Sequence, residues 1–136
     1  MRSVKSAITA LLVSCLFVSE IALAAFQCYS SHDKFGEFVG YGQSKQAAYL
    51  DSYNTCRLFV PYSDLSDCQR SSKSCNMIRD FTQCYFYNSM TDQYFLGKGA
   101  DEKQSLAMAK LVCEKETQED RHHCHKSYIK MCQKEV

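Results

Sequence analysis

The two halves of the chain carry the same series of cysteines, aromatic residues and glycines in the same order. Residues 83–132 repeat residues 27–75, and corresponding positions lie 56 or 57 residues apart. Each copy has a Gln-Cys-Tyr start, two glycines separated by one residue, and three further cysteines. A repeat of this length is typical of one small structural unit used twice. We therefore predict two cysteine-rich modules, residues 25–80 and residues 81–136.

The first module is predicted to contain a hairpin, a helix and a less regular closing segment. Residues 26–30 and 35–41 have the aromatic, alternating character of two strands. Ser44 has the side chain expected at a helix start, and the helix must end before Pro61. Residues 68–75 are predicted to be a third strand or an ordered loop.

The second module repeats this order, so each module is predicted to be a small α+β unit. Residues 81–87 and 93–96 predict the two strands, Asp101 the start of a helix, and residues 124–132 the closing segment. The joining residues 76–80 lack the glycine, proline and serine of a flexible linker. We therefore expect the two modules to pack together.

The first 24 residues have the pattern of a secretory signal peptide. Arg2 and Lys5 precede an apolar run at residues 7–18, and an Ala-Leu-Ala sequence ends at Ala24. We expect cleavage after Ala24 and a periplasmic or extracellular location. Lipidation of Cys15 is an alternative, but the residues after it stay apolar where a lipoprotein normally becomes polar. No later segment is apolar for long enough to cross a membrane.

Cysteine usage predicts a disulfide framework. Loss of Cys15 with the signal peptide leaves eight of the nine cysteines, four in each module. An even number in an exported chain favours disulfides. If both modules pair alike and internally, the favoured bonds are Cys56–Cys68, Cys28–Cys75, Cys113–Cys124 and Cys84–Cys132. The alternative joins Cys28 to Cys56 and Cys68 to Cys75, with the same pattern in the second module.

Two Gly-x-Gly sequences lie between a predicted strand and a predicted helix. Gly40 and Gly42 form the first pair, and Gly97 and Gly99 the second. Backbone amides in such a turn could hold a phosphate, but the third glycine of a dinucleotide fingerprint is missing. We predict tight turns in which glycine supplies a positive φ.

Three histidines surround a cysteine in the second module. His122, His123 and His125 could bind a transition metal. The matching stretch of the first module has no histidine, so the scaffold does not require them. We predict a polar surface loop, with no bound metal and no other cofactor.

Candidate recognition residues are the strand tyrosines and one turn histidine. Tyr29, Tyr85 and Tyr87 lie where neighbouring side chains point to opposite faces, so some of these rings could be exposed for protein or glycan recognition. The alternative is that they fill a core that is short of leucine and isoleucine. His32 in the first hairpin turn is added to this group because the second turn differs from it.

Charge and residue content favour binding over catalysis. Each module carries equal numbers of cationic and anionic side chains, which argues against a nucleic-acid partner recruited by bulk charge. No catalytic residues are predicted, since His32-Asp33 has no serine nucleophile beside it and no cysteine remains as a thiolate. We expect an exported protein that acts by binding a protein or glycan, as an inhibitor, an envelope-associated recognition protein or a secreted effector. The alternatives are a hydrolase with its site between the modules and a metal-binding envelope protein.

Overall fold

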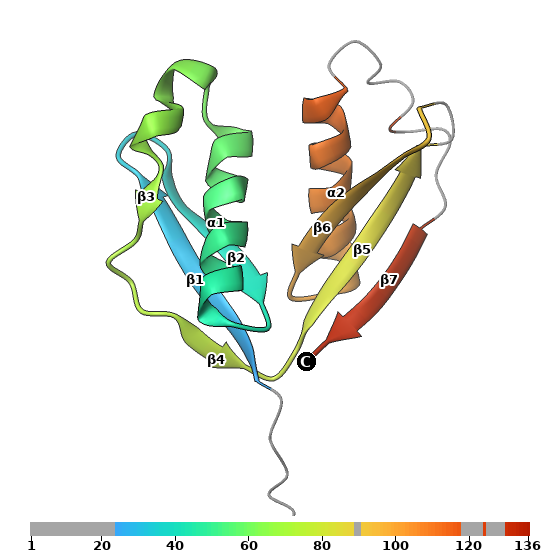
Figure 1. Ribbon diagram of the computed structural model, residues 1–136, viewed down its shortest axis with the longest axis horizontal. Helices are drawn as coiled ribbons and strands as arrows, with labels where there is room; N and C mark the ends of the chain where they lie inside the picture. Colours follow the sequence, from blue (N-terminus) through green and yellow to red (C-terminus); the bar gives the residue numbers. More distant parts are fainter. Residues whose placement is uncertain (1–23, 89–90, 118–123, 125–129) are drawn as a thin grey trace, which may run out of the picture.

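The computed structural model describes residues 24–88, 91–117, 124 and 130–136 as an α+β protein with two sheets, each packed on one helix (Figure 1). The predicted signal peptide and Cys15 lie outside these residues. The first half contains β1 (Ala25–His32), β2 (Gly36–Gly42), α1 (Lys45–Phe59), the short 3-10 helix η2 (Tyr62–Asp67), β3 (Gln69–Arg70) and β4 (Asn76–Ile78). The second half contains β5 (Phe81–Asn88), β6 (Gln93–Gly99), α2 (Glu102–Glu116) and β7 (Lys130–Glu135).

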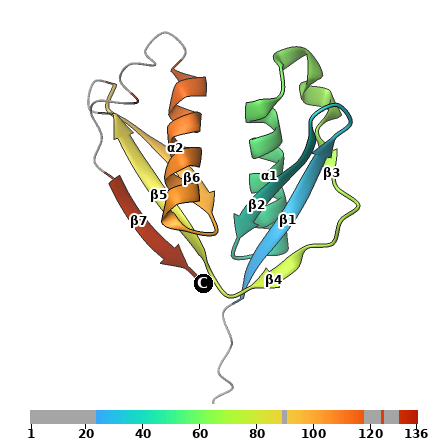
Figure 2. The ribbon, with the colours of Figure 1, turned by 180° about the vertical axis from the view of Figure 1, so that it is seen from behind.

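Both sheets are antiparallel and have the hairpin's second strand at one edge. The first sheet has the order β2-β1-β3, with β4 also paired to β1, and the second has the order β6-β5-β7. In both views the helices and the edge strands β2 and β6 lie on the inner sides of the two halves (Figures 1 and 2). The halves meet at their base and diverge from it, so the molecule has the shape of a V.

Capping residues determine where the helices begin. The Ser44 side chain accepts a bond from the Ala47 amide at 3.1 Å, and the Asp101 side chain accepts one from the Gln104 amide at 2.8 Å. Gln104 in turn accepts a bond from the amide of Ala100, just before the cap. The bonds to the Ala47 and Gln104 amides satisfy donors that the first helical turn leaves without intrahelical partners, and the Ala100 bond fixes the residue before the cap. The sequence-based start of each helix is therefore confirmed.

Glycine allows each helix to approach its sheet closely, and the expectation of positive φ in the Gly-x-Gly turns was wrong. Of the five glycines only Gly36, in the first hairpin turn, has a positive φ, of 85°. A Cβ atom on Gly40 would lie 2.0 Å from the Ser52 amide nitrogen. One on Gly97 would lie 2.1 Å from the Ser105 oxygen. These glycines are required because helix backbone occupies the place of a side chain.

Small residues and sulfur fill the space between each helix and its sheet. The buried face of α1 consists of Ala48, Ser52 and Cys56, and that of α2 consists of Ser105, Ala109 and Cys113. The buried serines are satisfied: Ser52 bonds Ser30 at 2.7 Å, and Ser105 donates to the Thr82 oxygen at 2.7 Å. Such a thin core buries little apolar area, so covalent bonds are needed to stabilise it.

Four disulfides supply that stabilisation, two in each half. One bond of each pair ties the last turn of the helix to the segment that follows it, and the other ties the first strand of the hairpin to the closing segment. The bonds are Cys56–Cys68, Cys28–Cys75, Cys113–Cys124 and Cys84–Cys132. This is the pairing favoured from the repeat, and none of the eight described cysteines is bonded across the halves.

The halves pack together at the base of the V. The rings of Tyr41 and Phe81 stack with centroids 6.2 Å apart, and Ala25 completes a small buried cluster with them. The Gln43 side chain donates to Glu135 at 3.1 Å. This bond links the turn between β2 and α1 to the end of β7. The expected packing between the modules is thus present at this contact. No helix in the described part of the chain is long and apolar enough to span a membrane.

Candidate functional site

A groove of about 1060 Å³ runs between the two halves, with walls from α1 and α2 and from the edge strands β2 and β6. Its apolar lining includes Leu50, Leu58 and Phe59 from the first half and Leu96, Met108 and Leu111 from the second. Leu50, Phe59 and Leu96 are 60%, 44% and 38% exposed. Large apolar side chains gathered in one concave, exposed place are characteristic of a binding site.

The walls arise because each helix has a second apolar face besides the one on its sheet. Leu50 and Leu58 lie eight residues apart on α1, and Ala107 and Leu111 lie four apart on α2, spacings that place side chains on one helical face. Since the sheet-facing residues are the small ones, these larger side chains point elsewhere. The sequence contains this signal, but only the placement of the two halves brings the faces together.

The base of the groove holds a polar cluster that spans the halves. The Asp51 carboxylate accepts a bond from the Tyr41 amide at 2.8 Å, and the Lys98 ammonium donates to the Tyr41 carbonyl at 3.4 Å. Burial raises the pKa of Asp51, while the Tyr41 amide bond and the charge of Lys98 oppose that rise. Burial likewise raises the pKa of the Tyr41 phenol. The cluster therefore combines a tight main-chain contact with a partly desolvated carboxylate.

The backbone of β2 faces the groove at alternate residues. Both the amide and the carbonyl of Tyr41 are bonded on the side away from β1. Strand geometry repeats every two residues, so the amide and carbonyl of Val39 also point to that side. Among the described strands β2 pairs only with β1. Val39 lines the groove, and strand geometry directs its main-chain amide and carbonyl to the same side as those of Tyr41.

The predicted recognition tyrosines lie on the sheet faces opposite the helices, outside this groove. All three are half-buried and have bonded hydroxyls. Tyr29 donates to Gln27 at 3.1 Å, Tyr85 accepts from Gln83 at 2.7 Å, and Tyr87 donates to Asp92 at 2.7 Å. The bond to Asp92 raises the pKa of Tyr87. The structure does not bring these three rings together with the groove residues.

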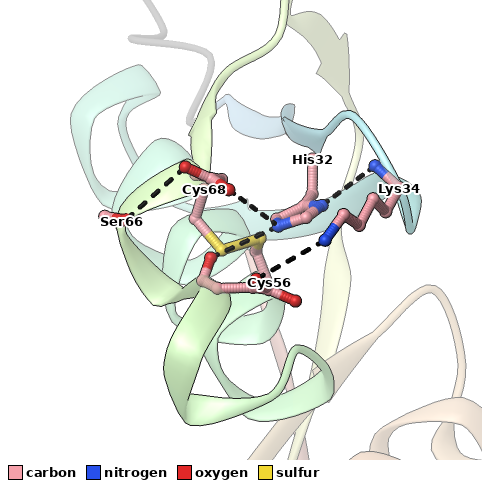
Figure 3. A network of polar contacts seen from close by, with 7 residues as sticks. His32, Lys34, Cys56, Ser66 and Cys68 are labelled. Atoms are coloured by element: carbon pink, nitrogen blue, oxygen red, sulfur yellow. Dashed lines mark hydrogen bonds and ion pairs between the residues drawn. A yellow bond between two sulfur atoms is a disulfide. The ribbon is translucent and has the colours of Figure 1, made fainter.

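His32 is inside the protein, only 3% exposed, where it connects the first hairpin to η2 (Figure 3). Its Nδ1 accepts a bond from the Lys34 amide at 3.1 Å, so the hydrogen is on Nε2, which lies 3.3 Å from the Asp64 carbonyl. Its Nε2 also lies 3.9 Å from the Asp67 carboxylate. With both nitrogens engaged, His32 offers a partner little surface.

The predicted metal candidates His122, His123 and His125 lie outside the described residues. Within residues 24–88, 91–117, 124 and 130–136, no group of three or more histidine, cysteine or acidic side chains is arranged to hold a metal ion. Cys124, which these histidines flank, is bonded to Cys113.

The groove lies between the modules, the place that the alternative hypothesis of a hydrolase assigns to the active site. Its described lining contains five charged side chains but no serine, cysteine or histidine; the charged residues are Glu37, Asp51, Arg57, Lys98 and Glu116. Apart from Tyr41, the described lining has one hydroxyl group, that of Thr55. It donates to the Asp51 carbonyl at 2.9 Å. The described lining is therefore a mixture of many apolar side chains with several charged ones.

Comparisons of the chain with models of known protein families, with curated protein sequences and with solved structures gave no match.

Proposed function

We propose that the protein acts by binding, and that the groove between α1 and α2 holds an extended apolar segment of another exported protein. The observation that carries this proposal is that apolar side chains and an open strand edge lie along the same groove. Apolar side chains that are partly exposed line its walls, and the open edge of β2 runs along it. Together they match the two requirements of strand addition, in which main-chain bonds give affinity and pockets for alternate side chains give specificity.

The open edge also needs an explanation in its own right. Exposed sheet edges promote aggregation, and proteins usually protect them with charges, bulges or covering elements. At the base, Asp51 and Lys98 form hydrogen bonds with the main-chain amide and carbonyl of Tyr41. Farther along the strand, Val39 lines the groove together with apolar side chains. A partner segment paired with Val39 would cover both the edge and the apolar walls.

A rigid frame suits this role because it lowers the entropic cost of binding. Each helix is held by a cap at its start, by glycine-permitted contact with the sheet and by a disulfide in its last turn. Preorganisation of this kind increases affinity without additional contacts. The four disulfides indicate an oxidising environment. We further propose that the mature chain begins near Ala25 and works in the periplasm or outside the cell.

The test is selection of linear peptides of about ten residues on the mature, oxidised protein. Selected peptides should carry apolar residues at alternate positions. The double variant Leu58→Gln/Leu111→Gln should weaken binding at least about tenfold, because two apolar contacts in the groove are lost. Met77→Gln, an exposed apolar residue outside the groove, is the matched control and should leave affinity unchanged.

A second arm tests strand pairing itself. N-methylation of single peptide amides should abolish binding at alternate positions only, because only those amides would face β2. Peptides that bind the double variant as tightly as the parent protein would contradict the groove. Loss of affinity from N-methylation at every position, or at none, would contradict pairing with β2.

A further inference from the structure

A second pocket, of about 520 Å³, lies on the flank of α1 that faces β3. Its lining includes Lys45, Gln46, Tyr49, Tyr53 and Arg70. The volume is within the range of about 300–1,000 Å³ typical of small-ligand sites. Its residues differ from those of the groove, apart from Leu50 on the ridge between the two.

Among the described residues that line it, the pocket has two cations and no carboxylate. The guanidinium of Arg70 lies 3.8 Å from the centroid of the Tyr49 ring. Within the described residues neither Arg70 nor Lys45 forms an ion pair, and both side chains are exposed. Arginine stacked on an aromatic ring keeps the edge of its planar group available, and that edge can bond an anion through two parallel contacts.

The second module shows that the scaffold does not need these residues. With the helix caps Ser44 and Asp101 aligned, Glu102 stands where the first module has Lys45. In the same alignment Leu106 and Lys110 replace Tyr49 and Tyr53. The same strand–strand–helix unit forms with either set. The aromatic and cationic residues of this pocket are therefore available for a role other than folding.

Lys45 is also unfavourable for the helix that carries it. It occupies the first position of α1, where the helix dipole disfavours a positive charge, and α1 has no acidic residue in its first turn. The equivalent turn of α2 has Glu102, which suits the dipole. A bound anion near Lys45 would offset this repulsion, since it would interact favourably with both the ammonium and the helix start.

We infer that this pocket binds an acidic sugar, a sugar ring that bears a carboxylate or a sulfate group. The fork of Arg70 bonds the anionic group and Lys45 adds its charge. Gln46 and the tyrosine hydroxyls bond the ring hydroxyls, and the exposed part of the Tyr53 ring packs against the sugar's apolar face. The pocket offers two cations, and the module as a whole carries equal numbers of positive and negative side chains. This charge suits one small anion better than a nucleic acid, which requires an extended basic surface.

The inference is tested by calorimetric titration of the mature, oxidised protein with a tetrameric oligouronate, a sulfated tetrasaccharide and the carboxyl-reduced, neutral form of the oligouronate. At least one acidic tetramer should bind, about tenfold or more tighter than the neutral one, because hydrogen bonds to charged groups are worth about ten- to hundredfold in affinity. Arg70→Gln and Lys45→Glu should each weaken that binding about tenfold or more. Lys103→Glu on α2, which makes the same change in net charge, should not weaken it.

Several results would overturn the inference. They are equal affinity for the neutral sugar, equal losses in Lys103→Glu and Lys45→Glu, or no binding of either acidic tetramer at millimolar concentration. Tighter binding of a phosphopeptide than of both acidic tetramers would assign the pocket to a different ligand class. Because Lys45→Glu follows the charge found in α2, a failure to fold is not expected to obscure the outcome. Circular dichroism of each variant checks this point.

Discussion

The Lys98 ammonium donates to the carbonyl of Tyr41 at 3.4 Å, and these two residues occupy the same position in their respective modules. Tyr41 pairs with Gln27 in the first hairpin, and Lys98 pairs with Gln83 in the second. Equivalent surfaces therefore meet at the base of the groove, as they do in a two-fold symmetric dimer. The two residues differ in kind, so the contact between the modules is no longer symmetric in its chemistry.

The pH dependence of stability should report on Asp51. Its pKa is raised from the ordinary 3.8, so the folded state keeps a proton that the unfolded state releases as the pH rises between the two pKa values. The free energy of unfolding should therefore fall as the pH rises through that window and stay lower above it. Asp51→Asn keeps an acceptor for the Tyr41 amide and cannot ionise. It should show a weaker pH dependence and a higher free energy of unfolding at neutral pH.

Urea unfolding between pH 3.5 and 8 checks the role of Asp51, and Asp33→Asn in the exposed hairpin turn controls for the loss of one carboxylate. The prediction is wrong if Asp51→Asn is less stable than the parent protein at neutral pH, or if both variants change the pH profile equally.

The glycines of β2 and β6 should be intolerant of alanine for steric reasons. Gly40→Ala forces a methyl group into the backbone of α1 and should lower the free energy of unfolding by about 3 kcal/mol or more. Gly36→Ala is the control, because it has open space around it and a φ of 85°. It should cost only the left-handed backbone penalty, about 1–2 kcal/mol. Chemical denaturation that ranks the two variants in the opposite order would contradict the close helix–strand contact.

The two disulfides of a module should contribute unequally. Cys28–Cys75 closes a sequence separation of 47 residues and Cys56–Cys68 one of 12. Loop-closure entropy predicts that replacing the first pair by alanine destabilises the protein by about 1 kcal/mol more than replacing the second. Guanidinium unfolding of the two double variants measures the difference. A larger loss from the shorter loop would mean that packing around η2 outweighs chain entropy.

The charge at the start of α1 should affect stability independently of any ligand. Lys45→Glu places an acidic residue where the helix dipole favours one and should raise the free energy of unfolding by about 0.3–1 kcal/mol. Glu102→Lys, the reverse change at the same position of α2, should lower it by a similar amount. Thermal unfolding at low ionic strength measures both changes, and added salt should reduce them. Shifts of the same sign in both variants would rule out the dipole as their cause.

The module and its disulfide pairing could be predicted because they depend on local patterns that occur twice. Caps at Ser44 and Asp101 and cysteines at matching positions restrict each half almost independently of the other. The closing segments were less predictable. In the second module β7 pairs with β5 over six residues, whereas in the first the chain leaves the sheet between β3 and β4. There the Ser71 hydroxyl donates to Glu37 and accepts from the Lys73 amide, side-chain contacts that no strand pattern indicates.

The groove was missed for a different reason. Leu58 and Leu111 are far apart in the chain, and each has an ordinary place on an amphipathic helix. Contacts between the modules, among them Tyr41 with Phe81 and Lys98, bring their helices to face each other. These contacts depend on the packing of one module against another, which no periodicity within a module encodes. The strand positions of Tyr29, Tyr85 and Tyr87 could be predicted more readily than their function. Alternation along a strand predicts which face of the sheet a side chain lies on, but not what covers that face.

Among the described residues, the contacts observed between the halves lie at the base of the V, and this has a mechanical consequence. Each helix is fixed to its own sheet along its length, so the walls of the groove behave as two stiff arms joined at the Tyr41–Phe81 stack. A small rotation about that joint would leave the base almost unchanged and move the tips of the arms the most. The width of the groove therefore depends on the angle between the two halves. A substitution at the Tyr41–Phe81 contact can change ligand affinity at the far end of the groove without changing any residue there.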